Sequence, residues 1–104
     1  ALQMLHVLVV DDSKFNRGRV VAALTAEQVQ ISEAVDGLDA LEKLATFPAD
    51  VICMDLLMPR LDGFGLLRAL REAGRCIPVV VLSADIQTSS RELCRDLGAV
   101  AFLN

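Results

Sequence analysis

The sequence contains no tryptophan and no tyrosine, and its aromatic side chains come mainly from four phenylalanines. A hydrophobic core must therefore be built from aliphatic residues, which the 54% share of hydrophobic residues supplies. Charged residues make up 23% of the chain, a balance typical of a globular protein and not of a disordered one. With 104 residues, we expect one domain that spans residues 1–104.

The sequence also has no strongly basic stretch, and its formal net charge is −4. This balance argues against direct binding to nucleic acid or to an anionic membrane. No apolar run approaches the roughly 18–20 residues of a membrane span, and no segment has the pattern of a signal peptide. Cys53, Cys76 and Cys94 form neither a CxxC pair nor an even disulfide framework. We therefore expect reduced, buried cysteines in a cytoplasmic protein.

Three continuous apolar runs indicate buried strands: Val7–Val10, Val51–Met54 and Val79–Leu82. Runs without polar alternation are typical of strands that are covered on both faces, as in a parallel sheet between helices. The shorter segments 30–34 and 101–103 are weaker and fit strands at the sheet edges. The sequence therefore predicts five strands.

Four amphipathic segments alternate with these strands, and local signals indicate where each helix begins or ends. The first has Val20, Val21 and Leu24 on its predicted inward face and follows a Ser13 N-cap, and the second has Leu38, Leu41 and Ala45 and follows the Asp36-Gly37 turn. The third has Leu66, Leu67 and Leu70 and lies between Asp62-Gly63 and Gly74. The fourth has Leu93 and Leu97 and lies between a Ser89-x-x-Glu92 capping box and Gly98.

Strands that alternate with helices predict an α/β fold, a flavodoxin-like doubly wound sheet of five parallel strands in the order 2-1-3-4-5. A helix should follow the last strand, but the sequence ends at Asn104. We therefore expect a domain truncated at its C-terminus, with its last helix absent from this chain. The apolar sheet surface left open would favour a homodimer or strand exchange.

Acidic side chains follow the predicted strands. Asp11 and Asp12 follow the first strand, Asp55 follows the third, and Ser83-Ala84-Asp85 follows the fourth. The carboxyl ends of these strands meet at one edge of such a sheet, so these side chains should converge. Close carboxylates repel one another, and a hard cation such as Mg²⁺ removes that conflict. Taken singly, each aspartate also has a structural interpretation as a helix N-cap.

Three segments together resemble the receiver domains of bacterial two-component response regulators: 8–13, from Leu8 to the Asp11-Asp12-Ser13 triplet, 54–63, which contains Asp55, Met58-Pro59 and Asp62-Gly63, and 80–84. Asp36-Gly37 and Gly98-Ala99 also fit this family, and the resemblance covers essentially the whole chain. The stretch 83–87 resembles chemotaxis-type receivers attached to a phosphatase-like domain.

The resemblance implies that Asp55 accepts a phosphoryl group from a sensor histidine kinase. Asp11, Asp12, Asp55 and the backbone carbonyl of Leu57 would bind Mg²⁺. Ser83 would donate its hydroxyl to the phosphoryl group, and the backbone N–H groups of Leu57 and Ala84 would assist it. Beyond this transfer to its own Asp55, the domain would catalyse only slow autodephosphorylation.

Phe102 matches the family's switch aromatic, whose rotation would change the surface of the fourth helix and the last strand. That surface would control a partner, an attached C-terminal effector domain or a homodimer. A second interpretation, in which Phe102 is a core residue, is compatible with this role.

Two features depart from the family pattern or vary within it. The family's essential lysine, normally followed by proline, is expected immediately after Asn104, and Lys14 and Lys43 lie in helical regions where they cannot replace it. Without this lysine, phosphotransfer and switching would be impaired. Leu57 and Asp85 occupy positions that vary among receivers and tune the lifetime of the phosphoryl group. His6 begins the first strand and is expected to be structural.

Two other functions compete with the signalling switch. Phosphohydrolases of the haloacid dehalogenase type also use an aspartate nucleophile with Mg²⁺, but they require an acid two residues after it, where this chain has Leu57. A degenerate receiver that acts only as a docking module would fit the missing lysine, although Asp11, Asp12, Asp55 and Ser83 argue against it.

Overall fold

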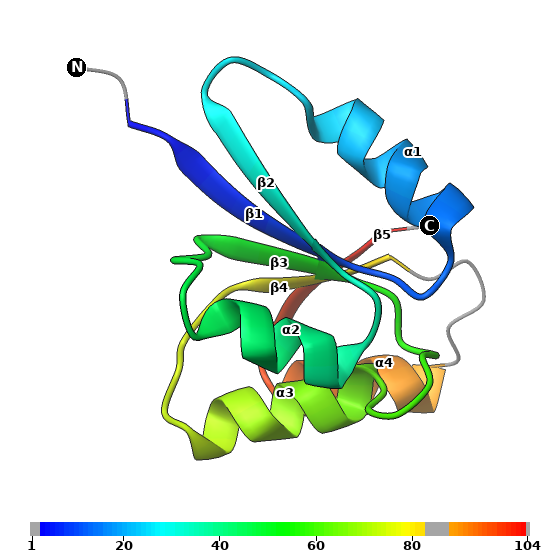
Figure 1. The fold of residues 1–104 in the computed structure, drawn as a ribbon. Helices are drawn as coiled ribbons and strands as arrows, with labels where there is room; N and C mark the ends of the chain where they lie inside the picture. The colour runs from blue at the N-terminus through cyan, green and yellow to red at the C-terminus, as the bar shows by residue number, and fades with distance from the viewer. Residues whose placement is uncertain (1–2, 83–87, 104) are drawn as a thin grey trace.

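A computed structural model describes residues 3–82 and 88–103 of the chain (Figure 1). Strands and helices alternate throughout. They are β1 (Leu5–Val10), α1 (Lys14–Leu24), β2 (Val29–Ala34), α2 (Gly37–Leu44), β3 (Val51–Met54), α3 (Gly63–Glu72), β4 (Val79–Leu82), α4 (Thr88–Asp96) and β5 (Ala99–Leu103). The strands form one parallel sheet in the order β2-β1-β3-β4-β5, which confirms the predicted fold class and strand order.

The centre of the sheet brings the ends of β1 and β3 to the same level. Val10, the last residue of β1, pairs with Ala34 on one side and with Met54 on the other. The ladder continues for one residue beyond the strands, because Asp55 N–H donates to the carbonyl of Val10 at 3.0 Å and Asp11 N–H donates to that of Ala34 at 3.1 Å. The chain order reverses between β1 and β3, where a binding site is expected in an open α/β sheet.

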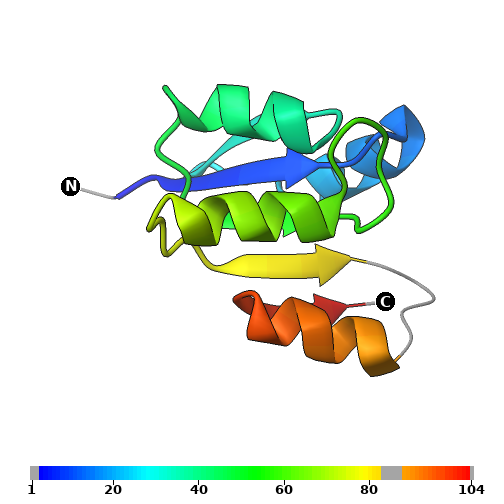
Figure 2. The same cartoon turned by 90° about the horizontal axis from the view of Figure 1, so that it is seen from below.

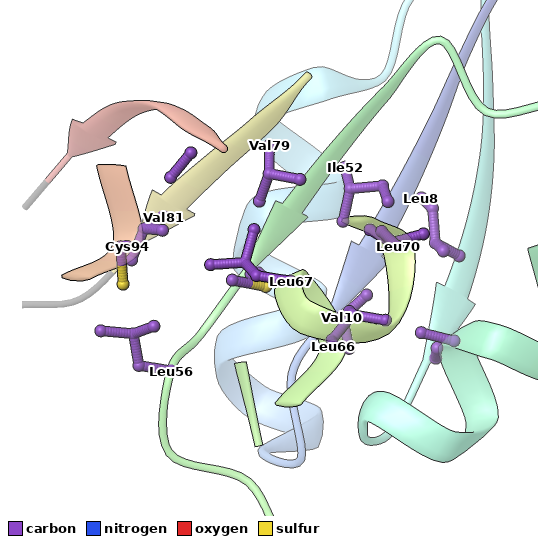
Figure 3. Close-up of a cluster of buried hydrophobic side chains, with 14 of the residues drawn as sticks. Leu8, Val10, Ile52, Leu56, Leu66, Leu67, Leu70, Val79, Val81 and Cys94 are labelled. Carbon is purple, nitrogen blue, oxygen red and sulfur yellow. The ribbon is translucent and has the colours of Figure 1, made fainter. Parts of the chain in front are cut away.

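Helices cover both faces of the sheet. In Figure 2, α2, α3 and α4 lie on one face, and α1 lies on the other. The larger core lies between the sheet and α2–α4, and Figure 3 shows its aliphatic side chains. Burial of one aliphatic side chain as large as leucine contributes about 1.5–3 kcal/mol to the free energy of folding, so this core is the main support of the sheet. Its fully buried members include Leu8, Val10, Ile52, Met54, Leu66, Val79, Val81 and Cys94.

The smaller core lies beneath α1. Val7, Val9 and Cys53 are buried there, and the predicted inward residues of α1, Val20, Val21 and Leu24, pack against them. Among the described helices, the longest has 11 residues, and none is long and apolar enough to cross a membrane.

The predicted Ser13 N-cap is confirmed, and Asp36 and Asp62, predicted to lie just before the second and third helices, cap those helices. The side chains of Ser13, Asp36 and Asp62 accept hydrogen bonds from the backbone N–H groups of Asn16, Asp39 and Gly65. Gly74 and Gly98, predicted to follow helices, adopt φ angles of 69° and 113°. This left-handed backbone favours glycine and stops each helix after its last turn.

The predicted inward face of α2 is partly wrong. Leu41 packs against the larger core, but Leu38 is 45% exposed and Ala45 is an exposed C-cap residue. Ala40 and Leu44 are buried instead. The face of α2 that is buried therefore differs from the predicted one, because it includes the small Ala40, and alanine gives a weaker sequence signal than leucine.

Two further predictions are corrected at α4 and in the loop before β4. The helix α4 begins at Thr88, so Ser89 lies inside it and does not open it. Cys94 is the fully buried residue on the inward face of this helix, whereas Leu93 is 39% exposed. Cys53 and Cys94 are buried as predicted, but Cys76 is exposed because it lies in the connection between α3 and β4.

Candidate functional site

The three predicted acidic residues lie together at the carboxyl end of the sheet. One carboxylate oxygen from each of Asp11, Asp12 and Asp55 can be chosen so that all lie within 4.8 Å of one another. Asp11 and Asp12 follow β1, and Asp55 follows the neighbouring strand β3. The parallel register between these strands therefore produces the predicted convergence.

Local hydrogen bonds fix the backbone that carries these carboxylates. One oxygen of Asp11 accepts the N–H of Ser13 at 2.9 Å, and one oxygen of Asp55 accepts the N–H of Leu56 at 2.8 Å. Arg17, one turn into α1, donates from Nη1 to the backbone carbonyl of Asp11 at 2.8 Å and from Nε to Glu33 at 2.9 Å. Arg17 was not predicted as a site residue, because its only signal in the sequence is its position one turn after the Ser13 N-cap.

The carboxyl group of Asp11 is electrostatically strained. Asp11 exposes only 8% of its surface, and this burial raises its pKa. The nearby carboxylates of Asp55 and Asp12 raise the pKa further, whereas the N–H of Ser13 and the guanidinium of Arg17 oppose the shift. A cation placed among these oxygens would remove the repulsion.

The donor set fits a hard divalent cation. All three side chains offer carboxylate oxygens, which are the ligands that Mg²⁺ prefers, and Mg²⁺ is usually held by one or two carboxylates and several waters. Leu57, whose backbone carbonyl is the fourth predicted ligand, lies in the loop directly after Asp55, and its side chain points largely into solvent.

Of the other predicted site residues, the described part of the chain contains only Phe102. Ser83, Ala84 and Asp85 fall outside the described residues, so their predicted positions stay predictions. Phe102 lies in β5, pairs in register with Val81 of β4 and packs against the larger core.

The ring of Phe102 also contacts helix α4. The guanidinium carbons of Arg91 and Arg95 lie 5.9 and 5.7 Å from its centroid, within the range of cation–π contacts. Phe102 thus joins α4 to β5 and is partly buried, which is compatible with both the core interpretation and the switch role.

An ion pair that was not predicted connects the loop after Asp55 with the residue that caps α2. Arg60, in the loop after Asp55, donates from Nε to Oδ2 of Asp36 at 2.6 Å and from Nη2 to Oδ1 at 3.0 Å. These hydrogen bonds hold the pKa of Asp36 below its usual range. No sequence pattern connects residues 36 and 60, because only the fold brings them together.

His6 lies at the opposite edge of the sheet. Its N–H donates to Oδ2 of Asp50 at 2.8 Å, its Nδ1 lies 3.3 Å from the same oxygen, and its ring packs edge-on against Phe47. The structural interpretation of His6 fits these contacts.

Comparisons with known proteins agree with this arrangement. The family model described as the response regulator receiver domain matches residues 7–104. The chain is 44% identical over 103 residues to a protein-glutamate methylesterase/protein-glutamine glutaminase of Myxococcus xanthus, with 96% of this chain and 30% of that protein covered. It is 36% identical over 99 residues to the response regulator MprA of Mycobacterium ulcerans, with 95% and 43% covered.

The chain thus spans less than half the length of these two relatives. Among solved structures, the signal receiver domain of the response regulator NarL from Mycobacterium tuberculosis superposes with a TM-score of 0.89 at 32% identity, with 97% of this chain and 83% of that chain covered. The family match over nearly the whole chain, the shared fold and the three converging aspartates lead to one conclusion: the chain belongs to the response regulator receiver domain family.

Proposed function

We propose that this chain is a phosphoacceptor switch in which Asp55 receives a phosphoryl group from a sensor histidine kinase, next to a bound Mg²⁺ ion. The observation that carries the proposal is the convergence of Asp11, Asp12 and Asp55 within 4.8 Å at the ends of two neighbouring strands. These carboxylates would hold the ion together with the backbone carbonyl of Leu57. Bound Mg²⁺ supplies positive charge that offsets the charge on phosphoryl oxygens.

The transfer itself needs a correctly placed carboxylate. An oxygen of Asp55 attacks the phosphorus of a phosphohistidine, an O–P bond forms, and the N–P bond breaks with its electron pair left on the imidazole. The product is an acyl phosphate on Asp55, which water later hydrolyses slowly. The hydroxyl of Ser83 and the N–H groups of Ala84 and Leu57 would donate hydrogen bonds to the transferred group.

Phosphorylation would change the surface formed by α4 and β5. Phe102 lies in β5 and has Arg91 and Arg95 of α4 over its ring, so a rotation of this ring would break or remake contacts with that helix. We propose that this surface controls an attached output domain or a second copy of the chain. We also propose that the protein is located in the cytoplasm, where a histidine kinase donates the phosphoryl group.

The output domain is a separate part of the proposal. One relative is named as a methylesterase and glutaminase, and this chain covers 30% of its length. An attached esterase-type domain is therefore a candidate for the output, beside the phosphatase-like domain expected from residues 83–87.

The test compares the parent protein with Asp55→Asn after incubation with acetyl phosphate and Mg²⁺. We expect intact-mass spectrometry to detect one phosphoryl group per chain on the parent, none on Asp55→Asn, and none when EDTA replaces Mg²⁺. Asp50→Asn, at the other edge of the sheet, is the matched control and should be phosphorylated like the parent.

Two results would contradict the proposal. Continuous hydrolysis of phosphate esters without a stable adduct would favour a phosphohydrolase. Absence of any adduct on the parent would favour a docking module.

A further inference from the structure

The loop that follows Asp55 is tied to the beginning of α2. Besides the paired hydrogen bonds from Arg60 to Asp36, the N–H of Gly37 donates to the carbonyl of Leu61 at 2.8 Å. The side chain of Asp36 is 3% exposed, whereas that of Arg60 is 58% exposed. The carboxylate of Asp36 is thus buried in the fold, and the more exposed side chain of Arg60 extends to it from the loop.

Capping alone does not explain this pair. Asp36 Oδ1 already accepts the N–H of Asp39 at 2.8 Å, which caps α2 without any help from Arg60. The arginine adds a two-pronged (bidentate) contact from another loop, in which two parallel hydrogen bonds fix the orientation of the guanidinium relative to the carboxylate.

Arg60 also adopts an unfavourable backbone conformation. Its φ angle is 62°, in the left-handed region that favours glycine, and it is the one non-glycine residue with positive φ in the part of the chain that the structure describes. The N–H of Leu61 donates to the carbonyl of Pro59 at 2.7 Å, so Arg60 lies at the centre of a three-residue turn. Strain of this kind persists only where the surroundings enforce it, and it gathers at functional sites.

The pair fixes the far end of a loop whose near end is the acidic cluster. The near end is closed by the Leu56 N–H to Asp55 contact at 2.8 Å and by the Gly63 N–H to Leu56 carbonyl bond at 2.8 Å. Leu57 lies between these anchors with its side chain 77% exposed, so little side-chain packing holds it. The direction of the Leu57 carbonyl and N–H must therefore depend on how the two ends of the loop are held.

We propose that Arg60 is a positioning residue for the phosphoacceptor site, and that its ion pair with Asp36 holds the Leu57 backbone in the orientation that the site needs. This inference rests on the proposed function and adds residues 36 and 60 to it. In this proposal, both side chains act through the loop and not as ligands of the metal or the phosphoryl group.

Arg60→Gly is the decisive variant. Glycine adopts positive φ without strain, so the change removes the ion pair and relieves the turn at the same time. We expect the thermal unfolding midpoint of the metal-free protein to stay the same or rise. We also expect Mg²⁺ binding, measured by titration calorimetry, to weaken about tenfold, as is common when a group that orients metal ligands is lost. A residue with a merely structural role would not give these opposite signs.

A metal-independent measurement accompanies the titration. In the metal-free protein, we expect the backbone amides of Leu57 and Leu61 to exchange hydrogen roughly fivefold faster or more in Arg60→Gly, because the loop opens locally. Arg68→Ala, at an exposed position of α3, removes the same charge elsewhere and should leave both readouts unchanged.

The ion pair can be tested from its other partner. Asp36→Asn keeps an oxygen that can cap α2 but loses the charge that Arg60 needs, so it should weaken Mg²⁺ binding to a similar degree. The double variant Asp36→Asn/Arg60→Gly should show no further loss, since both changes remove one interaction. Arg60→Lys, which cannot form the two-pronged contact, should restore only part of the affinity.

The outcomes separate the two proposals. If Arg60→Gly binds Mg²⁺ and exchanges its loop amides like a parent protein that is itself competent, only the role of Arg60 is overturned. If losses in Asp36→Asn and Arg60→Gly are fully additive, the pair does not act as one unit and the inference fails. If the parent binds no Mg²⁺ and takes up no phosphoryl group, the proposed function fails together with the inference that rests on it.

Discussion

Acidic side chains at the two ends of the parallel strands, here called the amino-terminal and carboxyl-terminal edges of the sheet, have pKa values shifted in opposite directions. At the amino-terminal edge, Asp50 accepts the N–H of His6 and lies against its ring, and these hydrogen bonds lower the pKa of Asp50. At the carboxyl-terminal edge, Asp11 lies beside Asp12 and Asp55, and burial with these neighbours raises its pKa. The ionised carboxylate is thus stabilised by the fold at one edge and opposed by it at the other.

This difference distinguishes a structural acid from one that needs an external partner. Asp50 has its hydrogen-bond donors within the chain, so its charge contributes to folding. The charge of Asp11 is partly matched by Ser13 and Arg17, but the net effect of its surroundings still disfavours ionisation. A site that disfavours the charge of its most buried acid in the folded protein is suited to a cation that arrives from solution.

The largest expected difference between the edges is in metal binding. Asp12→Asn should lower the Mg²⁺ affinity at least about tenfold, because it removes a charged ligand, whereas Asp50→Asn should leave it unchanged. At a Mg²⁺ concentration ten times its dissociation constant, the parent should gain about 1.4 kcal/mol in free energy of unfolding, and this gain should fall to about 0.4 kcal/mol or less in Asp12→Asn.

Urea unfolding followed by circular dichroism, with and without EDTA, measures this gain, since the chain has no tryptophan or tyrosine to report by fluorescence. An equal response of the two variants would remove the distinction between the edges.

A smaller effect should follow when the strained charge is removed. Asp11→Asn keeps an oxygen for the Ser13 N–H but removes the charge from the cluster, so the metal-free variant should be more stable than the parent at pH 7. Solvent screening limits the gain to less than about 1 kcal/mol.

The pH dependence of this gain has a definite sign. Because the folded pKa of Asp11 is raised, its ionisation opposes folding above that pKa and has no such effect below the unfolded value near 4. The advantage of Asp11→Asn should therefore disappear as the pH falls through the raised pKa. Parallel unfolding curves between pH 7 and pH 4 test this, and a less stable variant at pH 7 would contradict it.

The smallest effect is expected at the amino-terminal edge, and its sign is opposite. The folded pKa of Asp50 is lowered, so its charge contributes stability above the unfolded value near 4, and this contribution is lost as the pH falls through the lowered pKa. Asp50→Asn should thus be slightly less stable than the parent at pH 7, and the difference should shrink as the pH falls through the lowered pKa of Asp50. Urea midpoints at pH 7 and at a series of lower pH values check this, and a difference that grows in acid would refute the pairing.

Much of the architecture could be predicted because its signals are local. Val7–Val10 and Val51–Met54 are continuous apolar runs, and both are strands at the centre of the sheet. Ser13 caps a helix as predicted, and the second and third helices begin after Asp36 and Asp62 as predicted, since a cap needs only the residues of the following turn. The inward faces of two helices were predicted wrongly because the buried residue is not a large aliphatic one. It is Ala40 in α2 and Cys94 in α4.

The candidate site divides in the same way. The sequence by itself determined which residues end the strands, and the rules for parallel sheets then predicted that Asp11, Asp12 and Asp55 converge. Only the tertiary structure decided that Asp11 is buried enough for its pKa to rise, and that Arg60 reaches Asp36 across 24 residues of sequence. Burial and long-range ion pairs depend on how separate loops approach one another, and no local pattern of residues encodes that approach.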